Sequence, residues 1–109
     1  MQKAKIKIEI NDYIIEKEGI IDNDVLVVKD SSDKITFDQK KLLLIKENDE
    51  LIINIDFKNK TVIYELVKEK KKFSNNFEIF SLTNEHKHVI INYQIEGASF
   101  LLKINYETI

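Results

Sequence analysis

The chain has 109 residues, of which 33% are charged, and its formal net charge is −2. This length is sufficient for one domain with a genuine hydrophobic core. All 17 basic residues are lysines, and the near-neutral charge balance gives no general reason to expect an anionic partner. The chain has no cysteine, which excludes disulfides, thiolate metal sites and cysteine nucleophiles.

No segment of the sequence has the pattern of a secretion signal or a membrane span. Charged and apolar residues alternate from Lys3 to Lys7, where a signal peptide needs an unbroken apolar stretch. The longest apolar runs, such as residues 25–28 and 42–45, are far shorter than the ~20 residues of a membrane helix. We therefore expect a cytoplasmic protein with no membrane partner.

Short apolar segments separated by polar turns recur along the whole chain, which is typical of successive β-strands. The first segment, residues 3–10, places isoleucines at alternate positions on one face and charged residues on the other. A second strand is expected at residues 13–16, before a break at Gly19. Further strands are expected, in chain order, at residues 24–29, 34–37, 41–46 and 51–57.

The last two segments show the clearest alternation in the chain. Residues 88–95 alternate apolar side chains with His88, Asn92 and Gln94, and residues 99–107 show the same period. Residues 96–98 include Gly97 and join the two segments tightly. This pattern predicts a closing β-hairpin.

Residues 61–72 fit two different structures. Val62 and Leu66 lie at helical spacing, and Thr61 is a suitable N-cap, so a helix is possible. However, residues 61–64 are rich in β-branched and aromatic side chains, which fit a pleated sheet better than a helix. We favour a strand.

About nine or ten strands in one small domain leave sheet edges that must be protected. Closing the sheet on itself removes those edges and gives one apolar face and one wet face. The sequence therefore predicts an all-β fold, a closed or nearly closed antiparallel meander β-barrel. A two-sheet β-sandwich uses the same alternation and is the alternative.

The order of these strands carries a family resemblance over nearly the whole chain. The matching stretches are residues 3–10, residues 18–21 leading into 24–29, residues 73–83 as one late strand, and the closing pair 88–93 and 100–107. In this layout the chain resembles the YwiB-like proteins, an uncharacterised bacterial family of calycin-type β-barrels. Asn75 and Asn76 stand where that family has a glycine, and asparagine also adopts left-handed backbone angles. The resemblance implies a barrel with a modest interior, and it carries over no functional residue.

His86 and His88 are the only histidines, and they are the weak candidates for metal ligands. Residues two apart on a strand point the same way, so both rings could reach one ion. Glu78 and Glu85 are carboxylates that would have to approach them, but no spacing requires this. We expect no metal site and no cofactor, because exposure of both histidines at the start of a strand is the simpler interpretation.

Lys68, Lys70, Lys71 and Lys72 form the one local basic cluster, and aromatic residues follow it. Single-strand nucleic-acid binders combine backbone charge with base stacking in this way. A lysine-rich turn or sheet edge that prevents aggregation, followed by aromatic residues of the core, explains the same pattern. We do not expect nucleic-acid binding through these lysines, since the chain also lacks arginine for bidentate contacts.

A ligand cavity inside the barrel is the remaining candidate site. Small barrels either fill their interior with side chains or hold one small molecule. Bulky residues dominate the inward set, which favours a packed interior, but an apolar lining would suit a small amphipathic ligand at the barrel mouth. The candidate lining residues are Phe37, Phe57, Tyr64, Tyr93, Phe100 and Tyr106.

No recognisable catalytic motif is present. No serine lies in a nucleophile elbow, no glycine-rich phosphate loop occurs, and the many carboxylates fit solvated strand faces and turns. We therefore expect a non-catalytic binding module for a small ligand or a protein partner. A purely structural or interaction protein with a filled barrel is the alternative.

Overall fold

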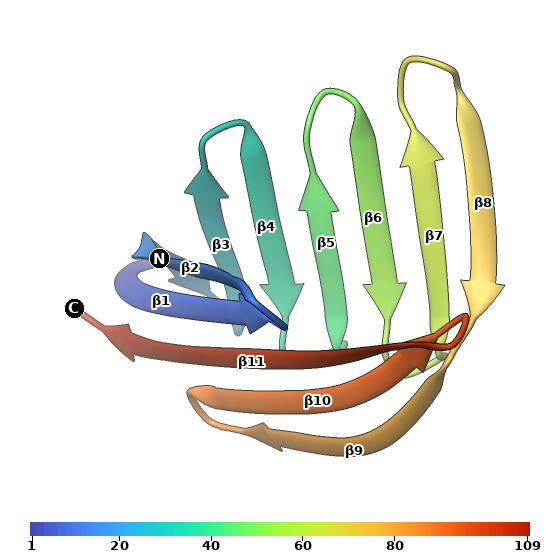
Figure 1. Ribbon diagram of the computed structural model, residues 1–109. Helices are drawn as coiled ribbons and strands as arrows, with labels where there is room; N and C mark the ends of the chain where they lie inside the picture. Colours follow the sequence, from blue (N-terminus) through green and yellow to red (C-terminus); the bar gives the residue numbers. More distant parts are fainter.

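Apolar residues at every second position make almost the whole chain β-strand (Figure 1). The structure, a computed structural model, describes residues 1–109 and contains eleven strands and no helix. In chain order the strands are β1 (Gln2–Ile10), β2 (Tyr13–Asp22), β3 (Val25–Asp30), β4 (Asp33–Asp38), β5 (Leu43–Glu47), β6 (Leu51–Asp56), β7 (Thr61–Leu66), β8 (Lys71–Asn76), β9 (Glu78–Glu85), β10 (His88–Ile95) and β11 (Ala98–Thr108).

The strands form one continuous antiparallel sheet in the order β8-β7-β6-β5-β4-β3-β2-β1-β11-β10-β9. The first strand pairs with both β2 and β11, which brings the two ends of the chain together. The two sheet edges, β8 and β9, are consecutive in the chain and are separated only by Phe77. The predicted antiparallel barrel is therefore confirmed as a nearly closed barrel, with an open seam between β8 and β9.

Figure 1 shows that the barrel has two unlike walls. Strands β3 to β8 stand side by side as three hairpins, while β9, β10, β11 and β1 cross below and in front of them. The hairpin ends of β3–β4, β5–β6 and β7–β8 extend beyond the crossing strands. These hairpin tips mark one end of the barrel, which we call the hairpin end.

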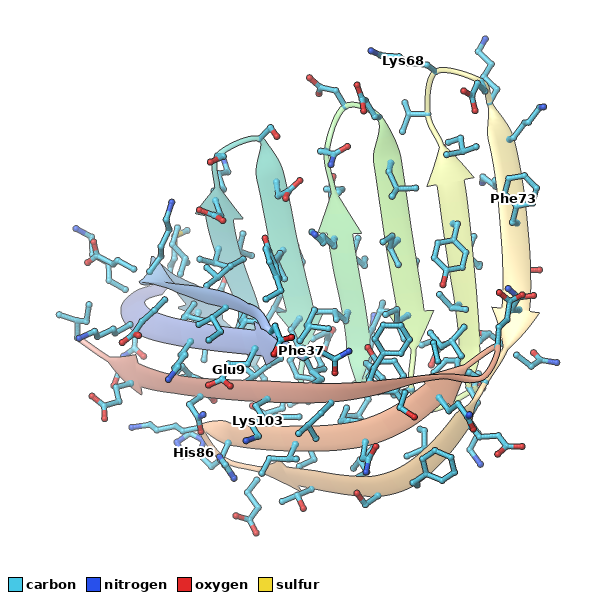
Figure 2. The ribbon with its side chains drawn as sticks, in the orientation of Figure 1. Glu9, Phe37, Lys68, Phe73, His86 and Lys103 are labelled. Carbon is cyan, nitrogen blue, oxygen red and sulfur yellow. The ribbon has the colours of Figure 1, made fainter.

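The core lies between these walls and is entirely apolar. All 20 buried residues are hydrophobic, and no polar or charged residue is buried. The tyrosines Tyr93 and Tyr106 bring the only side-chain polar groups, their hydroxyls, into this set. Ala4, Ile6 and Ile8 of β1 are each 0–1% exposed, as their alternation predicts. Figure 2 shows Phe37, which is fully buried, between the two walls.

The structure corrects three details of the sequence-based prediction. The segment 61–72 is strand and not helix, as favoured, but it contains two strands. The first, β7, ends at Leu66, and its hairpin partner β8 begins at Lys71. The break expected at Gly19 does not occur, because β2 runs through it without interruption. The late strand expected at residues 73–83 is divided at Phe77, whose buried side chain anchors the corner between β8 and β9.

Gly19 lies within β2 because β2 approaches β3 closely at this point. A Cβ atom there would lie 2.5 Å from the carbonyl oxygen of Val27 and 2.7 Å from Cδ1 of Ile6. We expect Gly19→Ala to lower the free energy of unfolding by about 1–3 kcal/mol, as overpacked sites do, and urea denaturation measures this.

Gly97 provides the matched control for the Gly19 variant. It has a φ of +81°, but no atom lies within 4 Å of a Cβ built there. Because asparagine tolerates positive φ, we expect Gly97→Asn to cost less than about 1 kcal/mol. Wild-type stability in Gly19→Ala would contradict the close approach of β2 to β3.

Candidate functional site

An apolar cavity of about 300 Å³ lies toward the hairpin end of the barrel. Nine of the ten residues that line it are hydrophobic, and the tenth is a lysine. The lining residues are Ile10, Tyr13, Leu44, Lys46, Ile53, Ile55, Tyr64, Tyr93, Ile95 and Phe100.

Strand register brings these residues together on the inner face of the sheet. Lys46 lies opposite Ile53, and Ile53 lies opposite Tyr64, so β5, β6 and β7 supply one side of the cavity. On the other side, Tyr93 lies opposite Phe100 in the β10–β11 hairpin. Cross-strand neighbours share one face of a sheet, which explains why residues distant in sequence line one cavity.

Hydrogen bonds hold the hairpin turns at the cavity opening. The backbone N–H of Asn11, in the β1–β2 turn, donates to the carbonyl oxygen of Leu101 over 3.1 Å, and Asn11 Oδ1 accepts from the Leu101 N–H over 2.9 Å. In the β10–β11 turn, Glu96 Oε1 accepts from Asn75 Nδ2 over 3.0 Å, which links that turn to β8. The opening is therefore built from turns that are fixed to neighbouring strands.

Aromatic rings pack around Tyr93 at the inner end of the cavity. The Tyr93 ring stacks on Phe100 with centroids 5.3 Å apart, and it meets Phe57 edge-on at 5.1 Å. Phe77 completes the group, with its centroid 5.7 Å from that of Tyr93. Such contacts fix ring orientation as well as burying area, so they give the cavity a rigid inner wall.

Three tyrosine hydroxyls and one lysine supply the polar groups of the lining. Burial raises the pKa of Tyr93 to about 12, with a smaller contribution from Tyr64. Burial also raises the pKa of Tyr64, with a further contribution from the negative charge of Glu96. All of these phenols therefore keep their protons at neutral pH and are available as hydrogen-bond donors.

Lys46 lies at the rim of the cavity and already has two partners. Its Nζ is 4.5 Å from the centroid of the Tyr13 ring and 3.8 Å from Asp33 Oδ2. Burial raises the pKa of Tyr13, and the charges of Asp33 and Asp30 raise it further, although Lys17 opposes them. Each of these two aspartates is paired with a lysine, Asp33 with Lys46 and Asp30 with Lys17.

The six predicted lining residues occupy three different environments. Tyr64, Tyr93 and Phe100 line the cavity. Phe37 and Phe57 are 0% and 2% exposed and belong to the packed core. Tyr106 is at the opposite end of the barrel, where its hydroxyl donates to Gln39 Oε1 over 3.2 Å.

Sequence reasoning missed Lys46, although its position carried a signal. Leu44 and Lys46 are two residues apart and therefore share the inner face of β5. A lysine that continues an inward-facing apolar series must lie at an open end of a barrel, because a buried charge is costly. That rule would have placed the opening beside β5.

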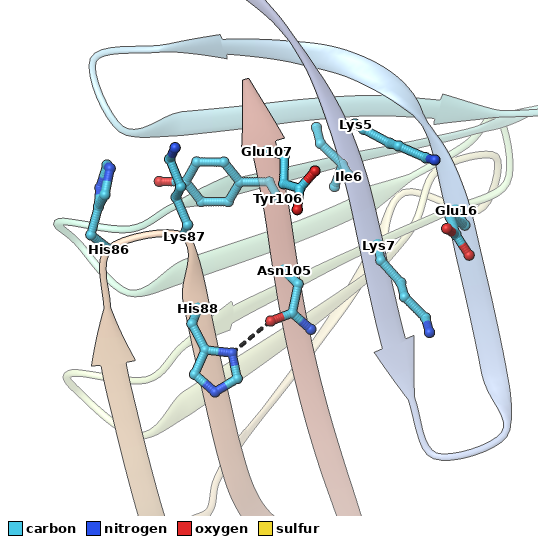
Figure 3. A pocket seen from close by; sticks show the side chains of 10 residues that line it. All are labelled: Lys5, Ile6, Lys7, Glu16, His86, Lys87, His88, Asn105, Tyr106 and Glu107. Carbon is cyan, nitrogen blue, oxygen red and sulfur yellow. Dashed lines mark hydrogen bonds between the residues drawn. The ribbon is translucent and has the colours of Figure 1, made fainter. Parts of the chain in front are cut away.

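The two histidines do not lie on one strand as expected. His86 is in the turn and meets the Tyr106 ring edge-on at 6.2 Å, while His88 begins β10. His88 Nδ1 is 2.6 Å from Asn105 Oδ1, and Figure 3 shows the two imidazoles pointing apart. No three His, Cys, Asp or Glu side chains are grouped closely enough to hold a metal ion.

The histidines border an open polar depression of about 440 Å³ on the barrel surface (Figure 3). Three lysines and two glutamates line it, and only two of its ten residues are hydrophobic. Its charges largely compensate one another. The smaller apolar cavity is the better candidate site, because ligand pockets are mainly apolar with few polar groups.

The lysine cluster lies at the β7–β8 hairpin and is partly paired with carboxylates. Lys68 Nζ is 3.8 Å from Glu50, and Lys72 Nζ is 3.7 Å from Glu65, so part of the positive charge is paired. Lys70 lies in the β7–β8 turn and Lys71 begins β8. Figure 2 shows Lys68 near the tip of this hairpin and Phe73 further along β8.

The aromatic residues after the cluster differ in exposure. Phe77 is 6% exposed and packs in the core, as expected. Phe73 and Phe80 are 53% and 57% exposed, so the expectation that they point into the core is wrong. Phe80 lies on β9, across the open seam from β8, whereas Phe73 follows Lys72 directly on β8.

The structure has no helix that is long and apolar enough to span a membrane. No family model matches the chain, and no curated protein or solved structure matches it either. The resemblance to the YwiB-like barrels and the cytoplasmic location therefore stay predictions.

Proposed function

We propose that this protein is a non-catalytic binding module that holds one small, mainly apolar ligand in the cavity at the hairpin end of its barrel. The observation that carries the proposal is the cavity of about 300 Å³ with a single charged residue in its lining. Barrel mouths are a usual place for such sites, and this volume is at the lower limit of ligand pockets. The ligand is accordingly smaller than a typical drug molecule.

The chemistry of the lining supports binding rather than catalysis. The cavity presents three tyrosines and one lysine among apolar side chains, and no carboxylate, histidine or serine lines it. General acid–base catalysis needs a group whose pKa lies near the working pH. The raised pKa values of Tyr13, Tyr64 and Tyr93 suit hydrogen bonding to a ligand.

Titration with the neutral dye N-phenyl-1-naphthylamine tests the cavity directly. We expect saturable binding of one dye molecule, seen as increased fluorescence. Ile53→Trp places a larger side chain in the cavity, and we expect it to weaken binding by about tenfold or more, equivalent to ~1.4 kcal/mol.

Ile63→Trp is the matched control. Ile63 lies on the neighbouring strand β7, is 40% exposed and does not line the cavity, so this variant should bind the dye as the wild type does. Circular dichroism confirms that both variants keep their strands. Equal affinities in the two variants, or no saturable binding by the wild type, would support the alternative of a barrel that binds no ligand.

Native mass spectrometry of the protein purified gently from its source cells identifies the natural ligand. A small co-purifying mass that is lost in Ile53→Trp supports the proposal. A stable complex with another protein in which the cavity stays free contradicts it.

A further inference from the structure

The Tyr93 hydroxyl has no hydrogen-bond partner in the protein, although its ring is buried. Tyr93 is 1% exposed, and the hydroxyl of Tyr106 is the one tyrosine hydroxyl that bonds to another side chain. No fully enclosed polar side-chain atom lacks a partner, so the Tyr93 hydroxyl reaches the surface of the cavity that its residue lines. Tyrosine hydroxyls of buried residues usually have a partner, and the accessible side of this one is the cavity, where either water or a ligand can accept its hydrogen bond.

We propose that the ligand carries an uncharged hydrogen-bond acceptor, such as a ketone, ester or amide oxygen, which accepts from the Tyr93 hydroxyl. The site then selects such compounds over carboxylates of the same size and shape. This inference rests on the proposed function, because it assigns the chemical class of the ligand held in the same cavity.

The charges around the cavity explain the selection against carboxylates. Lys46 is the only cation in the lining, and it is 3.8 Å from Asp33. No carboxylate lines the cavity, but Asp30 and Asp33 lie close enough to Tyr13, and Glu96 close enough to Tyr64, for their negative charges to raise the pKa values of these phenols. Lys17 is 2.8 Å from Asp30 and is therefore paired as well.

A carboxylate in this cavity would lose its hydration without gaining a free cation. Burial of an ionised carboxylate is costly unless it is paired and hydrogen-bonded. A neutral carbonyl gains the hydrogen bond from Tyr93 at a much smaller desolvation cost. The phenol remains protonated across the physiological range, so it donates under all ordinary conditions.

Competition between two ligands of matched shape tests this inference. 2-Nonanone and octanoate carry the same seven-carbon chain on a carbonyl carbon. The other substituent of that carbon is a methyl group in 2-nonanone and a charged oxygen in octanoate. Each is titrated against the protein loaded with N-phenyl-1-naphthylamine at neutral pH. We expect 2-nonanone to displace the dye at a concentration at least about tenfold lower than octanoate.

Tyr93→Phe removes the donor while keeping the ring. We expect the affinity of this variant for 2-nonanone, relative to its affinity for the dye, to fall roughly three- to tenfold, the usual effect of one hydrogen bond, because the dye has no carbonyl acceptor. Tyr106→Phe, at the other end of the barrel, should leave both affinities unchanged.

The possible outcomes separate the two proposals. If the dye binds but octanoate competes as well as 2-nonanone, the acceptor inference is wrong and the cavity proposal stands. The same holds if Tyr93→Phe binds 2-nonanone with wild-type affinity. If neither the dye nor 2-nonanone binds, both proposals fail. The comparison of the two ligands needs only the wild-type protein, so it remains decisive even if a variant does not fold.

Discussion

Replacement of Phe57 by alanine is expected to lower the free energy of unfolding by about 3–5 kcal/mol, the largest loss that we predict for a single substitution. Phe57 is 2% exposed and meets the rings of Phe77 and Tyr93 edge-on, with centroid distances of 5.8 and 5.1 Å. Its backbone N–H also donates to the carbonyl oxygen of Leu42 over 2.9 Å, which fixes the strand end behind the ring. Truncation would therefore leave a void that the surrounding strands cannot close.

Phe73→Ala is the matched control for this prediction, because it removes the same side chain from an exposed position. Phe73 is 53% exposed on the edge strand β8, so we expect its loss to cost less than about 1.5 kcal/mol. Urea denaturation followed by circular dichroism measures both variants. Similar losses in the two variants would contradict the division between a packed core around Phe57 and an open edge at β8.

The strands were predictable where side-chain alternation is unbroken and one face is buried. In β10, Val89, Ile91, Tyr93 and Ile95 are 0–6% exposed, as their period of two predicts. A slip of one residue would expose this whole apolar set, so the pattern specifies the register strongly. The closing hairpin was therefore the most secure part of the prediction.

The turns were less predictable because the chain has only two glycines. Nine other residues adopt positive φ, and some of them, such as Leu42, Lys60 and Lys70, are residue types that rarely do so. Their conformation is imposed by the strands on either side and not by local preference. This explains why the end of β7 at Leu66 and the start of β8 were not separated by sequence reasoning.

The candidate site was predictable only in part, because it depends on where the barrel stays open. Aromatic residues with inward alternation all look alike in sequence, yet Phe37 is packed in the core while Phe100 lines the cavity. The difference arises from the two unlike walls of the barrel, which extend to different heights (Figure 1). Relative wall height is a property of the whole sheet, and no local pattern encodes it.

Tyr93 is expected to make the stability of the protein fall steeply above pH 10. Burial raises its pKa in the folded protein to about 12, whereas the phenol of the unfolded chain titrates near the usual value of 10.0. Below pH 10 both states hold the proton, and the folded protein keeps its full stability. Between pH 10 and 12 the unfolded chain loses the proton first, which favours unfolding by up to about 3 kcal/mol.

The difference in the free energy of unfolding between the wild type and Tyr93→Phe isolates this effect, because the lysines and the other tyrosines titrate in both proteins. We expect the wild type to lose more stability than the variant over this pH range, when urea denaturation is measured at successive pH values. A constant difference between the two proteins across that range would contradict the prediction. It would mean that the Tyr93 hydroxyl is well hydrated in the folded protein, and the argument that this donor awaits a ligand acceptor would lose its basis.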